Sequence, residues 1–105
     1  MATTVGTEHP HIVRNPKVAG GDPTIAGTRI SVVFIVRQLR AGDRPEDILV
    51  SYPHLAPAAV YDAISYYHDH QDEIDRIIEE STPEVMAERY GFTVGADGRL
   101  VFRNR

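Results

Sequence analysis

The chain has 105 residues, a net charge of −4 and no cysteine, and 42% of its residues are hydrophobic. This length corresponds to about one domain with a modest core, and the apolar content argues against wholesale disorder. The absence of cysteine excludes disulfides, thiolate metal sites and cysteine nucleophiles, and it fits a cytoplasmic location.

No segment of the sequence has the character of a membrane span or a secretory signal. The longest apolar run, residues 30–36, is interrupted by Ser31 and is far too short to span a bilayer. The first dozen residues lack both a basic start and an apolar stretch. We therefore expect a cytoplasmic protein without membrane contact.

The charges are segregated along the chain. Residues 14–44 contain six basic and two acidic residues, whereas residues 45–88 contain eleven acidic residues and one arginine. Residues 89–105 are basic again, with four arginines and one aspartate. Because nucleic acids respond to local potential rather than to net charge, the first stretch is a candidate DNA-binding surface. The alternative is a solvated surface on which these charges are dispersed in space.

The N-terminal part is predicted to be a β arm. Residues 1–10 show no periodicity and are expected to be a flexible N-terminus. Residues 11–14 and 24–32 are expected to be short strands, joined by a stretch whose GGDP run (residues 20–23) is typical of turns. An isolated two-stranded arm is only marginally stable, so we expect it to lie on the helices or to pair with a second subunit.

Residues 32–41 are predicted to form the first helix. Ser31 is a favourable N-cap, and Gly42 is a typical residue to end a helix. Apolar side chains recur at the spacing of one helix face, namely Val32, Ile35, Val36 and Leu39. We expect Phe34 to lie largely off that face.

A second, short helix is predicted for residues 44–52. Asp43 and Glu46 have the spacing of a capping box, with Asp43 as the N-cap. The inner face of this helix would consist of Ile48, Leu49 and Tyr52.

Residues 57–80 are predicted to form one long third helix, which Pro57 would open. Its apolar or amphipathic positions follow a heptad seam of Val60, Ile64, Tyr67, Gln71, Ile74 and Ile78. A continuous helix of this length would measure about 36 Å. Because a three-helix globule of this size cannot cover such a helix, we expect its second half to pack on the partner in a homodimer.

The predicted fold class is mainly α. Residues 82–90 suggest a short helix, and the last segment alternates around Gly-Ala-Asp-Gly like a β-hairpin. We expect a flexible N-terminus (residues 1–10), a β arm plus helix-turn-helix domain with a three-helix core and an extended third helix (residues 11–80), and a C-terminal extension of helix and hairpin (residues 81–105).

Residues 12–68 resemble the bacterial domain-of-unknown-function 433 family. The segments that carry the resemblance are GGDPTIAGTRISV, AGDRPEDILVSYPHL and AVYDAISYY, and the strongest pieces are the GG-P-I-GTRI run and the YPHL turn. Members of that family are similar to antitoxins, and many are paired with a PIN-like nuclease toxin. The resemblance therefore implies a dimeric helix-turn-helix regulator of a type II toxin–antitoxin system, which neutralises a PIN-like ribonuclease and binds its own promoter.

Two departures from the family pattern bear on this interpretation. The family commonly has Ser or Thr at the positions of Arg44 and Ala56, where it would cap the second and third helices. The outward positions of the presumed recognition helix, taken as Ala58, Ala59, Tyr61, Asp62 and Ser65, offer an acid and no base. Because phosphate contacts need positive charge, the alternative is a protein-interaction module with the helix-turn-helix fold but without DNA binding.

Two sets of binding residues are expected. The candidate DNA-binding residues are Lys17, Arg29, Arg37, Arg40, Arg44, His54 and Tyr61. Arg29 could instead pair with a carboxylate and fix the arm. The candidate toxin-binding residues are Arg99, Arg103 and Arg105, because the resemblance implies a nuclease with clustered carboxylates, and arginine bonds a carboxylate at two points. The alternative is a hairpin that caps the long helix, with its arginines in water.

The sequence predicts no metal, no cofactor and no enzyme activity. The pairs His9/His11 and His68/His70 resemble metal ligands, but helix neighbours two apart point to nearly opposite sides, so we expect solvent-facing histidines. The acidic block after residue 69 is expected to be a solvated helix face with an Asp72–Arg76 pair. The serines all have capping or surface explanations, and no nucleophile lies beside a base.

Overall fold

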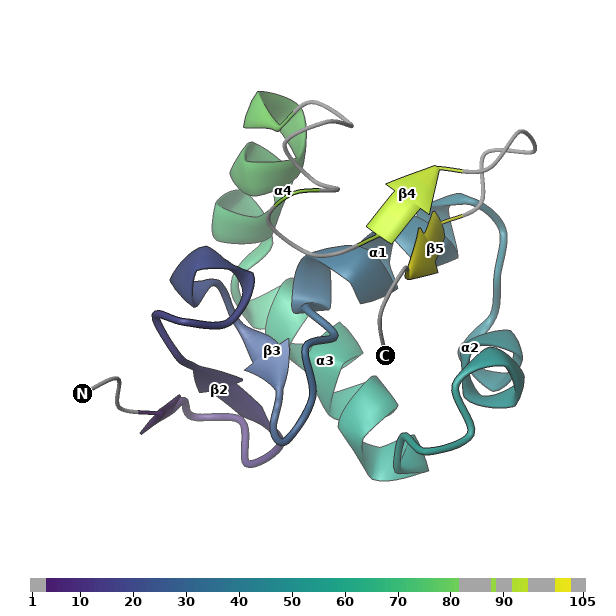
Figure 1. Cartoon of the computed structure of the whole chain (residues 1–105), viewed down its shortest axis with the longest axis horizontal. Coiled ribbons are helices and arrows are strands. Elements are labelled where there is room, and N and C mark those ends of the chain that lie inside the picture. The colour runs from purple at the N-terminus through teal and green to yellow at the C-terminus, as the bar shows by residue number, and fades with distance from the viewer. Residues whose placement is uncertain (1–3, 82–87, 89–91, 95–99, 103–105) are drawn as a thin grey trace.

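The computed structural model describes residues 4–81, 88, 92–94 and 100–102 (Figure 1). The elements in chain order are β1 (Val5–Gly6), β2 (Ile12–Arg14), the 3₁₀ turn η1 (Ala19–Gly21), β3 (Thr24–Ile25), α1 (Val32–Arg40), α2 (Pro45–Ser51), α3 (Pro57–Asp69), α4 (Gln71–Glu80), β4 (Phe92–Val94) and β5 (Leu100–Phe102). Helices form the majority of this mixed fold. None of the helices in the described part of the chain has the length and apolar character that a membrane crossing requires.

The N-terminal arm is a three-stranded antiparallel sheet in the order β1-β2-β3. The expected pairing of β2 with β3 is confirmed, with Ile12 opposite Ile25. The second strand is shorter than predicted, because the chain turns after Ile25 and the Ile25 N–H bonds the Ile30 carbonyl at 2.8 Å. Within the segment expected to be flexible, residues 5–6 pair with β2 as β1.

The turn signals between these strands are confirmed. Gly20 and Gly21 have φ values of +64° and +89°, in the left-handed region that favours glycine. These residues form η1 and bring β3 back beside β2. The turn therefore sets the antiparallel pairing of β3 with β2.

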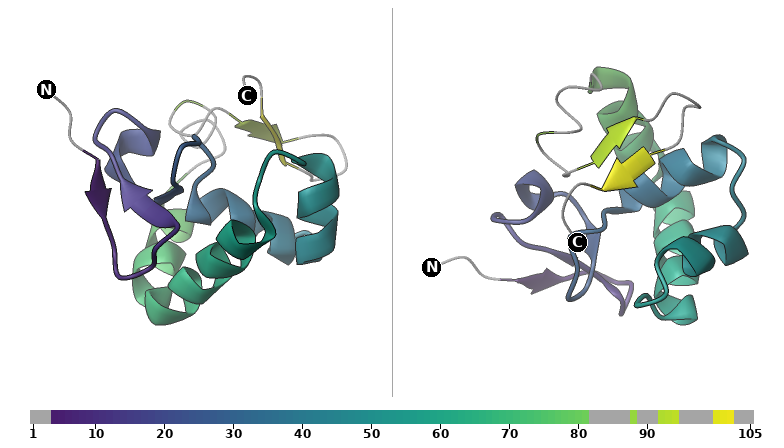
Figure 2. Two further views of the ribbon diagram at one scale, coloured as in Figure 1. Left: turned by 90° about the horizontal axis from the view of Figure 1, so that it is seen from below. Right: turned by 45° about the vertical axis from the view of Figure 1, so that its right-hand side comes forward.

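Helix α1 begins as predicted, because the Ser31 Oγ accepts a hydrogen bond of 3.0 Å from the Phe34 N–H. The expected single apolar stripe is too narrow, since Phe34 is fully buried and stacks edge-to-face with Tyr52 at a ring distance of 5.5 Å. The physical reason is the central place of α1, which contacts α2, α3, α4 and β5 (Figure 2). A helix covered on several sides needs apolar residues around most of its circumference.

Helix α2 is capped differently from the prediction. It begins at Pro45, and the N-cap is Arg44, whose backbone N–H donates to the Asp47 carboxylate at 2.8 Å. Asp43 is therefore not the cap, and it is buried instead. The expected inner face is confirmed by the burial of Ile48 and Tyr52.

The prediction of one helix over residues 57–80 is wrong. The helix is interrupted at His70, whose φ of −130° and ψ of 40° are not helical. Helix α4 starts at the next residue and turns away from α3 (Figures 1 and 2). The bend brings α4 against α1 and buries Ile74 completely within the same chain. The homodimer was expected because one long helix could not be covered within a single subunit. Since α4 packs on α1 of its own chain, this argument for a second subunit no longer applies.

The C-terminal hairpin is confirmed where it is described. Strands β4 and β5 pair antiparallel, with Phe92 opposite Phe102 and Val94 opposite Leu100, and β5 contacts α1. The predicted helix over residues 82–90 lies outside the described residues apart from Glu88, and so does the turn between β4 and β5.

The cap of α1 is testable by the substitution Ser31→Ala. We expect the free energy of unfolding to fall by about 1–2 kcal/mol, because the buried Phe34 N–H loses its acceptor. Urea denaturation would measure the change. The exposed Ser65 in α3 provides the control, since Ser65→Ala should change stability by less than about 0.5 kcal/mol. Equal stability of the two variants would contradict the capping role.

Candidate functional site

The arm is fastened to α3 by one inward-pointing carboxylate. Asp62 accepts a hydrogen bond from the backbone N–H of His11, and its other oxygen lies 2.8 Å from Nδ1 of His9. Only 14% of the Asp62 side chain is exposed. The expectation that Asp62 points outward from a recognition helix is therefore wrong, because its carboxylate is taken up by the arm.

His9 bridges two carboxylates of α3. Its Nε2 lies 2.8 Å from the Asp69 carboxylate, while Nδ1 contacts Asp62. Burial disfavours the charged ring, but the hydrogen bonds and charges of Asp62 and Asp69 outweigh burial and raise the pKa of His9 above its usual value of 6.5. The expectation of a solvent-facing histidine is wrong here, since His9 is only 8% exposed.

A second polar cluster joins the arm to the start of α4. Arg14 bonds the Tyr66 hydroxyl at 2.6 Å and pairs with Glu73 at 2.7 Å. The Tyr66 hydroxyl in turn donates to Glu73 at 3.0 Å. Burial and the neighbouring Glu73 raise the pKa of Tyr66 to about 12. The phenol therefore stays protonated and serves as a hydrogen-bond donor.

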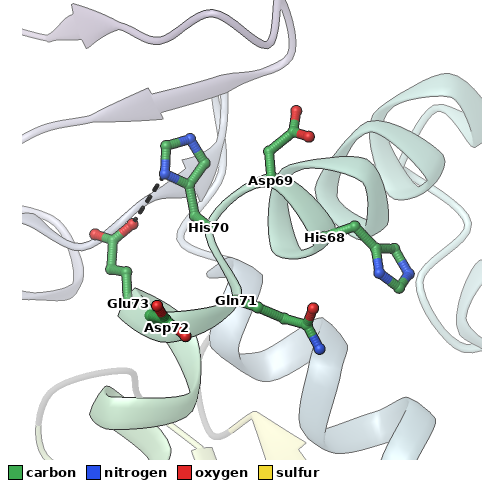
Figure 3. Close-up of a pocket in the computed structure, with 6 residues that line it drawn as sticks. All are labelled: His68, Asp69, His70, Gln71, Asp72 and Glu73. Atoms are coloured by element: carbon green, nitrogen blue, oxygen red, sulfur yellow. Dashed lines mark ion pairs between the residues drawn. The ribbon is translucent and has the colours of Figure 1, made fainter.

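His70 occupies the break between the two helices. Its ring stacks on Tyr66 at 4.2 Å, and its Nε2 lies 2.6 Å from Glu8. Its Nδ1 lies 3.8 Å from Glu73, as Figure 3 shows by a dashed line. A hydrogen bond within its own residue and the contact with His70 lower the pKa of Glu8 below its usual value. The break thus coincides with the point where arm, α3 and α4 meet.

The residues on both sides of the break line an open hollow of about 390 Å³, shown in Figure 3: His68, Asp69, His70, Gln71, Asp72 and Glu73. The rings of His68 and His70 lie on different sides of the junction, as the sequence predicted. Within the part of the chain that the structure describes, no three His, Asp or Glu residues are placed to hold a metal ion. The chemistry available here is ion pairing and hydrogen bonding.

Two of the predicted DNA-binding arginines lie beside carboxylates. Arg40 is paired with Asp75 at 2.6 Å and bonds the Tyr67 hydroxyl, and Arg44 lies 3.4 Å from Asp47. Arg37 is half-buried, and its Nε has no hydrogen-bond partner among the described residues. The expected Asp72–Arg76 pair is not among the ion pairs that the described residues form.

The remaining candidates are exposed. Lys17 and Arg29 lie on the arm, and neither side chain forms an ion pair with a described residue. His54 follows α2, and Tyr61 is 50% exposed on α3 with its hydroxyl 3.5 Å from Glu46. The toxin-binding candidates Arg99, Arg103 and Arg105 lie outside the described residues.

The interface between arm and helices was missed at the sequence level, although the sequence contains a signal for it. Asp62, Tyr66, Asp69 and Glu73 are spaced by four, three and four residues. This spacing places Asp62, Tyr66 and Asp69 on one face of α3, as a polar stripe beside the apolar one, and Glu73 follows in the first turn of α4. Such a stripe indicates a partner element that carries donors, which here is the arm.

The attachment of the arm is testable by Asp62→Ala. We expect the free energy of unfolding at pH 6 to fall by about 2–4 kcal/mol, because the His11 N–H and the His9 ring both lose their partner. Chemical denaturation would measure the change. Asp72→Ala removes an exposed carboxylate at the start of α4 and should change stability by less than about 1 kcal/mol. A similar small change for Asp62→Ala would show that the contact does not hold the arm.

Comparisons with known proteins place the chain in a family. Residues 12–67 match the family described as "Protein of unknown function (DUF433)". An uncharacterized protein of Mycobacterium tuberculosis is 39% identical over 57 residues, which are 54% of this chain and only 24% of that relative. A crystal structure of a DUF433 member protein from Anabaena variabilis superposes with a TM-score of 0.63 at 33% identity, covering 67% of this chain and 69% of that one. Because the family match extends over more than half of its residues, the chain belongs to the DUF433 family.

Proposed function

We propose that the chain is an antitoxin-like, non-enzymatic helix-turn-helix protein that acts first by binding a partner protein. The partner class is a PIN-like nuclease, as the family resemblance implies. Support for the helix-turn-helix assignment comes from the sequence of α2, a five-residue connection and α3, and from the packing of both helices on α1. A homodimer and a cytoplasmic location belong to this proposal.

The exposed surface of α2 and α3 is the observation that carries the proposal. Val50 is 81% exposed and Tyr61 is 50% exposed. Glu46 lies one helical turn from Val50 and contacts the Tyr61 hydroxyl, so the two apolar side chains belong to one surface. Exposed aliphatic and aromatic side chains beside each other are typical of protein-binding surfaces.

The charge of this surface favours a protein over DNA. Residues 45–75, which include α2 and α3 entirely, contain no lysine or arginine. A recognition helix without a cation lacks the groups that usually contact phosphates and guanine. Because Asp62 points inward, its carboxylate does not repel DNA phosphates from the outer face of α3. That face still has no positive charge that would attract them.

Promoter binding is a second proposed activity, and the arm supports it. Lys17 and Arg29 are exposed there without a carboxylate partner among the described residues, whereas Arg40 is held by Asp75. The arm is therefore better suited than α1 to contact DNA phosphates. This arrangement is consistent with weak, salt-dependent DNA binding.

The protein-binding surface is testable with the product of the adjoining reading frame, if that frame encodes a small nuclease. We expect Val50→Ser and Tyr61→Ala each to weaken the complex about tenfold or more, because central aromatic and aliphatic contacts dominate interfaces. Calorimetric titration would measure the affinity, and far-UV circular dichroism would show that the variants fold.

A matched control in the same titration is Lys17→Ala/Arg29→Ala, which should bind the nuclease like the unchanged chain. A variant with Arg99, Arg103 and Arg105 replaced by alanine tests the terminal arginines in parallel. Loss of binding in that variant alone, with Val50→Ser and Tyr61→Ala unaffected, would move the interface from α2–α3 to the tail. An adjoining frame without a nuclease would contradict the proposed partner class.

DNA binding is testable through its salt dependence on the chain's own promoter. We expect Lys17→Ala/Arg29→Ala to reduce the slope of log affinity against log salt by roughly 2, since each lost phosphate contact removes about 0.9. Fluorescence anisotropy at several salt concentrations would give the slope. Arg40→Ala is the control and should leave the slope nearly unchanged, because Asp75 already neutralises this charge. An equal loss per residue in the two variants would contradict the role of the arm.

A further inference from the structure

The N-terminal segment of residues 4–10 is attached to the helices mainly through ionisable groups, whereas the backbone of His11 is held separately by Asp62 and Ala26. Its strand β1 is exposed, and Val5 has 56% of its surface open to solvent. The contacts to the helices are those of His9 with Asp62 and Asp69 and that of Glu8 with His70. Little apolar burial therefore supports the segment, and its stability depends on the charges of these groups.

The geometry around His9 requires the doubly protonated ring. Each ring nitrogen lies 2.8 Å from a different carboxylate oxygen, on Asp62 and on Asp69. A neutral imidazole has one N–H donor, so one of the two contacts would bring a nitrogen lone pair against a carboxylate. Only the imidazolium can donate to both.

We propose that His9 is a proton-operated latch, which fastens residues 4–10 to α3 when protonated and releases them when it loses its proton. The release leaves β2 and β3 paired, because Ile12 and Ile25 are buried in the core independently of the ring. It frees the edge of β2 that β1 covers, and an uncovered strand edge can pair with another chain.

The other titratable groups around His9 act in the same direction. From α3, Asp62 and Asp69 contact the ring and Tyr66 lies edge-on at 5.3 Å, where its raised pKa keeps it neutral. His70 lies at 6.5 Å, and its contact with Glu8 is likewise strongest when the imidazole is charged.

The direction of the pH dependence follows from the raised pKa of His9. A group that binds its proton more tightly in the folded state stabilises that state fully below its ordinary pKa, which is 6.5 here. The stabilisation is lost as the pH rises through the folded-state pKa. The segment is therefore attached in mildly acidic solution, and it detaches as the pH rises above the folded-state pKa of His9.

Hydrogen exchange of the full chain tests the latch. The Thr7 N–H bonds the Ile12 carbonyl and exchanges when the segment detaches. We expect its protection factor, corrected for the intrinsic pH dependence of exchange, to fall at least tenfold between pH 6 and 9. The fall should follow the NMR titration of the His9 ring, while the Phe34 amide in α1 stays protected. Constant protection of Thr7 throughout the titration of His9 would overturn the proposal.

Matched variants assign the effect to one ring. His9→Gln cannot be charged and should give low Thr7 protection at every pH. His11→Gln is the control, because Asp62 contacts the backbone of His11 and not its ring, and it should keep the original profile. An unchanged pH profile of Thr7 protection in His9→Gln would refute the role of His9. If His70→Gln then lost the pH dependence, the effect would belong to His70.

Asp69→Asn makes the test independent of whether His9→Gln folds. Asp69 is 59% exposed and its side chain is nearly isosteric with asparagine, so the fold should persist. With one carboxylate neutralised, the midpoint of the Thr7 transition should move to lower pH. An unshifted midpoint would overturn the proposal.

Discussion

The carboxylate of Asp62 lies between the ring of His9 and the backbone N–H of His11, and the position of the arm on α3 depends on it. A charge with so little exposure is tolerated only when it is paired and hydrogen-bonded, and the arm supplies both kinds of partner. The stripe that begins at Asp62 continues through Tyr66 to Glu73 and binds Arg14. Arm, α3 and α4 therefore share one set of polar contacts, beside the apolar core to which the arm and α1 both contribute.

The sequence predicts the elements whose determinants are local. The Ser31 cap, the turn at Gly20 and the hairpin pairing all follow from neighbouring residues, and the structure confirms them. The break at His70 has no such local cause. The heptad seam runs through it without interruption, and the groups that hold the bend include Glu8, which is 62 positions away. Contacts of that separation leave no periodic pattern in the sequence.

The same limit explains why the candidate binding residues were only partly placed. The sequence shows how many basic residues a stretch contains, whereas binding depends on which of these charges remain unpaired on the folded surface. Arg14 and Arg40 are bound to acids of α4, so the arm keeps Lys17 and Arg29 as its exposed, unpaired cations among the described residues. The spacing of Asp62, Tyr66 and Asp69 indicates a polar stripe, but the burial of Asp62 depends on the distant arm, and an isolated aspartate on a helix is far more often exposed.

The break at His70 also changes the electrostatics of the acidic block. One continuous helix would have placed Asp72 and Glu73 in its interior, where the aligned peptide dipoles have no net end. Because α4 starts at Gln71, both acids lie in its first turn, next to the positive end of a new macrodipole. His68 correspondingly lies in the last turn of α3, at a negative end. The position of each of the two acids contributes about 0.3–1 kcal/mol, so two side chains that would gain nothing from the dipole of a straight helix favour the bent arrangement.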